Sequence, residues 1–190
     1  MPRLMVIIGS TRPGRVGLPV AQWFVRRASA HGGFELRLVD LAELNLPLLD
    51  EPNHPRLRRY THRHTREWSA RVEACDAFVL VTAEYNHSYP APLKNAIDYL
   101  HHEWRDKPVG FVSYGGVAAG TRAMQHLKSV IAALRMVPAV AAVNIPFVAQ
   151  LIGEDGALQA NEIMEQAVAA MLDELLRLHG ALRGLRAASA

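Results

Sequence analysis

Short apolar runs that alternate with helical patterns limit the fold of this chain more than any other feature. The clearest run, residues 77–82, is almost wholly apolar, as expected of a central parallel strand covered on both faces. Further strands are predicted at residues 4–8, 34–39, 109–114 and 137–143. Helices are predicted at residues 18–31, 61–74 and 92–104, after Gly116 as far as residue 134, and at residues 162–179. The proline-containing segment 40–58 is expected to be mostly loop.

Strict alternation of strands and helices implies right-handed crossovers and a parallel sheet with helices on both faces. Five such strands fit the flavodoxin-like, doubly wound order 2-1-3-4-5, which binds ligands outside strands one and three. A chain of 190 residues is of single-domain size. We expect one domain over residues 1–180, followed by a flexible tail, 181–190, that is rich in Ala, Gly and Arg.

Composition excludes several classes of protein. The net charge of +3 is too small to argue for a nucleic-acid partner. The single cysteine, Cys75, rules out an internal disulfide and a cysteine-based zinc site, and it suits a reducing cytoplasm. The chain has neither an apolar run of about 20 residues, as a membrane span requires, nor a secretory signal. We therefore expect a cytoplasmic protein without a membrane, nucleic-acid or metal partner.

The loop at residues 9–17 joins the first strand to the first helix. Its backbone amides and the helix N-terminus form a natural anion site, to which Ser10, Arg12 and Arg15 add hydrogen-bond donors and charge. The loop matches neither the Walker A motif nor the Gly-x-Gly-x-x-Gly dinucleotide fingerprint. A phosphate monoester is the expected ligand of this loop. The alternative is that the loop is only a polar turn with surface arginines and binds no ligand.

A second loop, residues 82–89, follows the central strand. Its backbone groups can line the edge of a flat heterocycle. Glu84 fits a cap or an ion-pair partner better than a general base, and Tyr85 fits either ring stacking or core packing. Asn86 tolerates a left-handed backbone and can simply shape the turn.

The third loop contains Ser113, Gly115 and Gly116. Glycines after a strand allow a ligand to approach the backbone closely, although a tight strand-to-helix turn is an alternative explanation. Each loop is a weak signal by itself. Together they follow strands one, three and four, so the fold would bring them to one edge of the sheet.

These motifs resemble the NAD(P)H-dependent FMN reductase family of flavodoxin-like proteins. The resemblance rests on Gly-Ser-Thr-Arg-x-Gly-Arg at 9–15, Glu-Tyr-Asn-His-Ser at 84–88, Leu-Lys-Asn-Ala-Ile-Asp at 93–98, and Lys-Pro-Val at 107–109 leading to Ser-x-Gly-Gly at 113–116. It implies bound FMN. Its phosphate would lie against Ser10, Arg12, Arg15, Val16 and Gly17, and its isoalloxazine would lie between two groups of residues: Thr82, Ala83, Glu84, Tyr85, Asn86 and His87 on one side, and Ser113, Gly115 and Gly116 on the other.

The resemblance also implies a function. NADPH or NADH would pass hydride to FMN, which would reduce a quinone, an azo compound, a metal oxyanion or free flavin by a ping-pong mechanism. No catalytic side chain is expected, because the flavin carries the chemistry. Family members are homodimers or homotetramers. The alternatives are a flavodoxin-like electron carrier, which the basic isoelectric point disfavours, and a non-catalytic flavin-binding or sensor protein.

Two departures from the family pattern and one basic segment leave alternatives open. Ala83 stands where the family usually has proline, which loosens the second loop, and His87 would either tune the flavin or only fill space. Residues 54–66 contain five arginines and three histidines and no acidic residue. This segment would either attract the 2′-phosphate of NADPH or form a solvated face.

Overall fold

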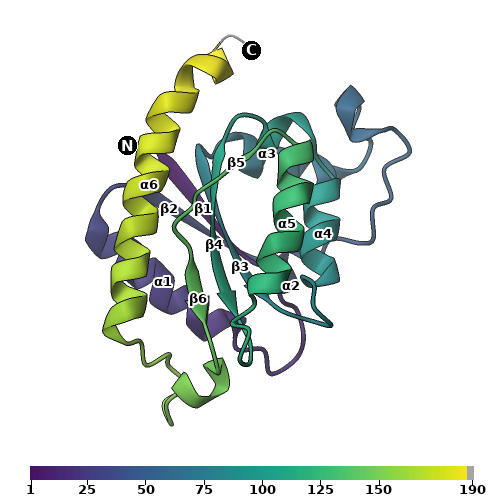
Figure 1. Ribbon diagram of the computed structural model, residues 1–190. Helices are drawn as coiled ribbons and strands as arrows, with labels where there is room; N and C mark the ends of the chain where they lie inside the picture. The colour runs from purple at the N-terminus through teal and green to yellow at the C-terminus, as the bar shows by residue number, and fades with distance from the viewer. Residues whose placement is uncertain (188–190) are drawn as a thin grey trace.

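The computed structural model describes residues 1–187 and contains a parallel sheet in the order β2-β1-β3-β4-β5, with β6 also paired to β4 (Figure 1). The order 2-1-3-4-5 expected from the sequence is confirmed. The strands are β1 (Arg3–Ile8), β2 (Glu35–Asp40), β3 (Ala77–Ala83), β4 (Pro108–Tyr114), β5 (Val137–Pro138) and β6 (Val143–Ile145).

The last predicted strand is wrong in one respect, because residues 137–143 do not form a continuous strand. Both β5 and β6 pair with β4, but the chain between them leaves the sheet. Val140 is exposed there, and the backbone N–H groups of Val140 and Ala141 donate to the Glu174 carboxylate at 3.0 and 2.8 Å. A helix side chain therefore satisfies amides that a continuous strand would have paired with its neighbour.

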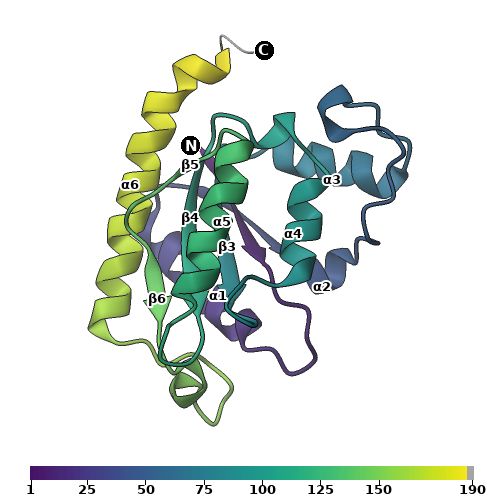
Figure 2. The ribbon, with the colours of Figure 1, turned by 45° about the vertical axis from the view of Figure 1, so that its right-hand side comes forward.

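Helices cover both faces of the sheet (Figures 1 and 2). Alternate residues of β1 point to opposite faces: Leu4, Val6 and Ile8 join one buried cluster, and Met5 and Ile7 join the other. The first cluster lies under α1 (Gly17–His31) and α6 (Glu162–Ala187). The second lies under α3 (Arg63–Glu73), α4 (Ala91–Asp98) and α5 (Thr121–Ala133).

Other elements also differ from the sequence-based expectation. The helix predicted at residues 92–104 ends at Asp98, and a separate 3-10 turn, η2, covers His102–Trp104. The segment predicted as loop contains the short helix α2 (Leu41–Leu44) and the 3-10 turn η1 (Pro55–Leu57), while η3 covers Val148–Leu151.

The closing helix runs eight residues beyond its expected end at residue 179 and ends at Ala187. Arg186 contributes to this extension, because its guanidinium donates to the Asp76 carbonyl oxygen at 3.0 Å. The last three residues of the expected tail, 188–190, lie outside the described residues. Figure 1 shows the end of α6 beside the N-terminus, at the end of the molecule opposite the loops discussed next.

Candidate functional site

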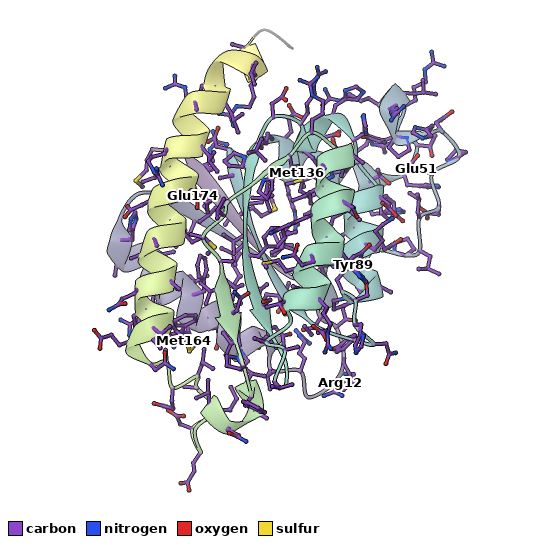
Figure 3. The ribbon with its side chains drawn as sticks, viewed as in Figure 1. Arg12, Glu51, Tyr89, Met136, Met164 and Glu174 are labelled. Carbon is purple, nitrogen blue, oxygen red and sulfur yellow. The ribbon has the colours of Figure 1, made fainter. Side chains whose placement is uncertain are left out.

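The three loops singled out in the sequence meet at the carboxyl edge of the sheet. Ile8 is in register with Val81, Ala83 with Tyr114, and Tyr114 with Ile145, so the strands end side by side. We call the surface formed by residues 9–17, 82–90 and 113–120 the three-loop edge. Figure 3 shows Arg12 at this end of the molecule.

The first loop is tied to β4 through a buried contact between two hydroxyl groups. Ser10 is fully buried, and its Oγ lies 2.9 Å from the Tyr114 hydroxyl. Burial raises the pKa of Tyr114 to about 12, so its hydroxyl stays protonated at neutral pH. A Cβ at Gly17 would lie 2.5 Å from Ser10 Oγ and 2.6 Å from the Tyr114 hydroxyl oxygen. Only glycine therefore fits where α1 begins.

The two arginines of the first loop have different surroundings. Arg15 forms an ion pair with the nearly buried Asp40 carboxylate at the end of β2, so its charge is already balanced. Its Nε is buried and has no hydrogen-bond partner among the described residues. Arg12 is exposed and has no ion-pair partner in the described part of the chain. Both arginines are expected to bind a phosphate. Arg12 can do so without breaking an existing ion pair, whereas Arg15 is already paired with Asp40.

The start of α1 completes an anion-binding arrangement. Its N-cap residue, Val16, provides no side-chain cap, and the first turn contains no acidic residue. The first backbone N–H groups of the helix thus keep their hydrogen-bonding capacity and carry the positive end of the helix dipole. Together with Arg12, they form a surface suited to a phosphate monoester.

The second loop is a tight turn that projects three polar or aromatic residues. Tyr85 and Ser88 exchange backbone hydrogen bonds of 2.8 and 3.0 Å, and Asn86 and His87 have φ angles of 50° and 66°. Two consecutive positive φ angles are typical of a type I′ turn. Asn86 therefore shapes the turn, as the sequence suggested, and the side chains of Tyr85, Asn86 and His87 are exposed. Thr82 is buried, and its hydroxyl donates to the Ala83 carbonyl oxygen at 3.0 Å.

Glu84 is an ion-pair partner of Arg122. Its carboxylate accepts hydrogen bonds from the Arg122 side chain at 2.6 Å and from the Arg122 backbone N–H at 3.2 Å. Burial raises the pKa of Glu84, but the hydrogen bonds and charge of Arg122 outweigh burial and hold the pKa below its ordinary value. The interaction joins the second loop to the first turn of α5.

The third loop is longer than the Ser-x-Gly-Gly motif. Ser113 Oγ is buried, 2.8 Å from the Ala119 carbonyl oxygen and 2.8 Å from Asn144 Oδ1, so it holds the loop together. Gly115 donates its N–H to the Ile145 carbonyl oxygen at 3.2 Å. A Cβ built on Gly116 would meet nothing within 4 Å. The surface above Gly116 is thus open to a ligand.

Sequence reasoning missed three residues that shape this edge, Asp40, Gly120 and Arg122, and it placed Tyr114 in the third loop without a role. Gly120 has a φ of 76°, and a Cβ there would lie 2.8 Å from the Tyr114 backbone. A glycine directly before a long helical pattern was the available signal for it. The other three act through partners that are distant in the sequence, which no local pattern reveals.

The basic segment 54–66 does not reach the three-loop edge within one chain. Glu51 accepts hydrogen bonds from the backbone N–H groups of Thr61 and His62, and Figure 3 shows Glu51 far from Arg12. His62 stacks on His64, which pairs with Asp50 at 2.9 Å. These contacts fit the solvated-face explanation for His62 and His64.

One hollow of about 560 Å³ is bordered by the C-terminal ends of α4 and α5 and by the chain around His54 and Arg56. A smaller one of about 340 Å³ lies between Thr11, α2 and Pro92. In residues 1–187 no cluster of three or more His, Cys, Asp or Glu side chains could hold a metal ion. Across the same residues, no helix combines the length and the apolar character of a membrane span.

Comparison with known proteins identifies the family. The model of the NADPH-dependent FMN reductase family matches residues 2–150. The chain belongs to this family. It is 40% identical to an NAD(P)H-dependent FMN reductase of Schizosaccharomyces pombe over 149 residues, which cover 76% of this chain and 74% of the relative. It is 37% identical to the NAD(P)H-dependent FMN reductase LOT6 of Saccharomyces cerevisiae over 143 residues, or 69% of this chain and 74% of the relative.

Other relatives of this FMN reductase carry the names NAD(P)H:quinone oxidoreductase, from Solanum tuberosum, and FMN-dependent NADPH-azoreductase, from Staphylococcus saprophyticus. Among solved structures, FerB, a flavoenzyme NAD(P)H:(acceptor) oxidoreductase from Paracoccus denitrificans, superposes with a TM-score of 0.75. That match covers 95% of this chain and 98% of FerB at 22% identity, so it supports the fold alone.

The protein is thus an FMN-dependent NAD(P)H oxidoreductase, and the residues of the three-loop edge fit the cofactor. The uncapped start of α1 and the free Arg12 guanidinium suit a phosphate. The buried Arg15 Nε that lacks a partner offers a further donor nearby. The open surface at Gly116 leaves room for a flat ring.

Proposed function

We propose that this FMN reductase binds the cofactor across the three-loop edge and passes its electrons to a small organic or inorganic acceptor. Arg12, Arg15, Ser10 and the N–H groups of Val16 and Gly17 would hold the phosphate. The second loop, from Thr82 and Ala83 through Glu84, Tyr85, Asn86 and His87, would border one side of the ring, and Ser113, Gly115 and Gly116 the other. The single observation that carries this proposal is the convergence of an uncapped helix N-terminus, a free arginine and an open glycine at one sheet edge.

When bound, FMN supplies the chemistry of accepting hydride from a nicotinamide and delivering electrons onward. The protein's own residues have a positioning role. The Ser10–Tyr114 contact keeps the phosphate loop against β4, and the Glu84–Arg122 pair keeps the second and third loops together. Hydride transfer from a nicotinamide to the flavin needs no side chain as a proton donor or acceptor. Glu84 can therefore stay a carboxylate that is paired with Arg122.

We propose a ping-pong mechanism because the donor and the acceptor would use the same open face in turn. Candidate acceptors are quinones, azo compounds, metal oxyanions and free flavin, and the names of the quinone- and azo-reducing relatives favour the first two. The test is oxidation of NADPH and NADH by FMN-loaded protein with a benzoquinone as acceptor, with visible absorbance recorded. Flavin bleaching followed by quinone-dependent reoxidation, with parallel double-reciprocal lines, is the expected result.

Three other outcomes of this experiment would change the proposal. Bound flavin that neither nicotinamide reduces would point to a flavodoxin-like electron carrier or a flavin-binding sensor. Protein that binds no FMN would overturn the assignment of the three-loop edge. Intersecting double-reciprocal lines would replace the ping-pong mechanism with one in which donor and acceptor are bound together.

We further propose a cytoplasmic homodimer or homotetramer whose residues 1–180 form one FMN-binding domain. The buried, unpaired Cys75 suits a reducing compartment. The outer side of α4 is the candidate subunit interface. It is flanked by the exposed Leu48 and Leu49 and by hollows of about 160 and 560 Å³.

A further inference from the structure

Two exposed aromatic side chains flank the open glycine of the three-loop edge. Ala83, Tyr114 and Ile145 are neighbours in register across three strands. Two residues further along each chain stand Tyr85, Gly116 and Phe147 in the same order. The Phe147 N–H donates to the Gly116 carbonyl oxygen at 3.1 Å, which keeps this row together beyond the sheet.

Phe147 has an unusual backbone conformation for its residue type. Its φ and ψ angles are 47° and 40°, in the left-handed region that favours glycine and asparagine. Burial of the ring does not explain this strain, because Phe147 is 49% exposed. Strained residues that packing does not explain are concentrated at ligand-binding sites.

A further exposed apolar side chain stands next to the open glycine in the chain. Val117, next to Gly116, is 79% exposed, and Tyr85 is 37% exposed. The nearby charges of Glu84 and Arg122 are paired with each other. A planar aromatic ring can stack against such a surface, whereas a compact oxyanion finds no unpaired charge in this group of residues.

From these observations we infer that Phe147 determines acceptor specificity by forming an aromatic wall, opposite Tyr85, for a planar aromatic acceptor. This inference rests on the proposed function, since it concerns the oxidation of flavin bound at the same edge. It distinguishes among the proposed acceptors: quinones and azo arenes would use Phe147, and compact inorganic anions would not.

The test compares 1,4-naphthoquinone with ferricyanide as acceptors for FMN-loaded wild type and Phe147→Leu. Loss of ring stacking is expected to raise the KM for naphthoquinone about 2- to 10-fold, as the energy of an aromatic pair implies, with little change in kcat. The ferricyanide KM and the rate of flavin reduction by NADPH in stopped flow should stay at the wild-type values. Val140→Ala, at an exposed apolar position between β5 and β6, is the control and should match wild type throughout.

The variant Phe147→Asn distinguishes a role of Phe147 in acceptor specificity from a role in the stability of the fold. Asparagine accepts the left-handed backbone, so this variant should keep or raise the Tm while still raising the naphthoquinone KM. A lower Tm with equal losses for both acceptors would show that Phe147 is structural and overturn the inference. Unchanged naphthoquinone kinetics in both variants would overturn it as well and leave the reductase proposal standing. Wild-type flavin that NADPH cannot reduce would instead refute the proposed function itself.

Discussion

Arg12 and Arg15 lie on the same loop, but their different partners lead us to expect different roles. Replacing Arg12 with Ala should weaken FMN binding about 10- to 100-fold, because a hydrogen bond to a charged group contributes about 1.5–3 kcal/mol. Riboflavin has no phosphate, so its affinity should not change. Quenching of flavin fluorescence measures both affinities. Arg26→Ala, an exposed arginine of α1, is the matched control. An equal loss of FMN and riboflavin affinity would show that Arg12 does not contact the phosphate.

Gly17 is a second position where a single substitution should change both stability and FMN binding. An alanine Cβ there would lie within 2.6 Å of two oxygen atoms, Ser10 Oγ and the Tyr114 hydroxyl. We expect Gly17→Ala to lower the free energy of unfolding by about 1–3 kcal/mol, as overpacking in a buried region does, and to weaken FMN binding. Urea unfolding gives the first value. Gly180→Ala, in open space on α6, should instead stabilise the protein by up to about 1 kcal/mol.

At the scale of secondary-structure elements, α3 depends on a carboxylate supplied by the preceding loop. Glu51 accepts hydrogen bonds from the Thr61 and His62 N–H groups at 2.8 and 3.0 Å, beside the start of the helix. Burial raises the pKa of Glu51, but these hydrogen bonds outweigh burial and lower the pKa to about 2. Glu51→Ala should therefore reduce the free energy of unfolding at pH 7 by about 1–2 kcal/mol.

The contribution of Glu51 to the free energy of unfolding should decrease as the pH falls. A carboxyl group whose pKa is lower in the folded state stabilises that state above its unfolded pKa, here 4.5, and the effect disappears as pH falls towards 2. The difference between wild type and Glu51→Ala should shrink across this window in urea titrations. Glu67→Ala, which removes an exposed pair with Arg63 on the same helix, should change the free energy of unfolding much less than Glu51→Ala does. A pH-independent difference for Glu51→Ala would argue against a charged cap.

For the whole molecule, the proposed oligomer places α4 at the subunit interface. Leu48 is 82% exposed and Leu49 43% exposed beside this helix, an arrangement that a partner subunit would cover. We expect wild type to sediment as a dimer or tetramer, and the double variant Leu48→Asp/Leu49→Asp to dissociate. Val140→Asp, at an 88% exposed position away from α4, should keep the wild-type mass. A monomeric wild type, or a variant that stays associated, would exclude this interface.

The sequence by itself determined the alternation of strands and helices and the three loops, because apolar periodicity and turn residues act over a few neighbouring positions. The strand order was inferred from the frequency of this fold, and the structure confirmed it. The sequence also favoured a turn role for Asn86, and for Glu84 a role as a cap or an ion-pair partner. Only the tertiary structure decided which arginine is free, that Ser10 meets Tyr114 from 104 residues away, and that Phe147 lies beside Gly116. It also decided that α6 continues to Ala187. Such outcomes depend on contacts between residues distant in the sequence, and chain folding alone brings those residues together.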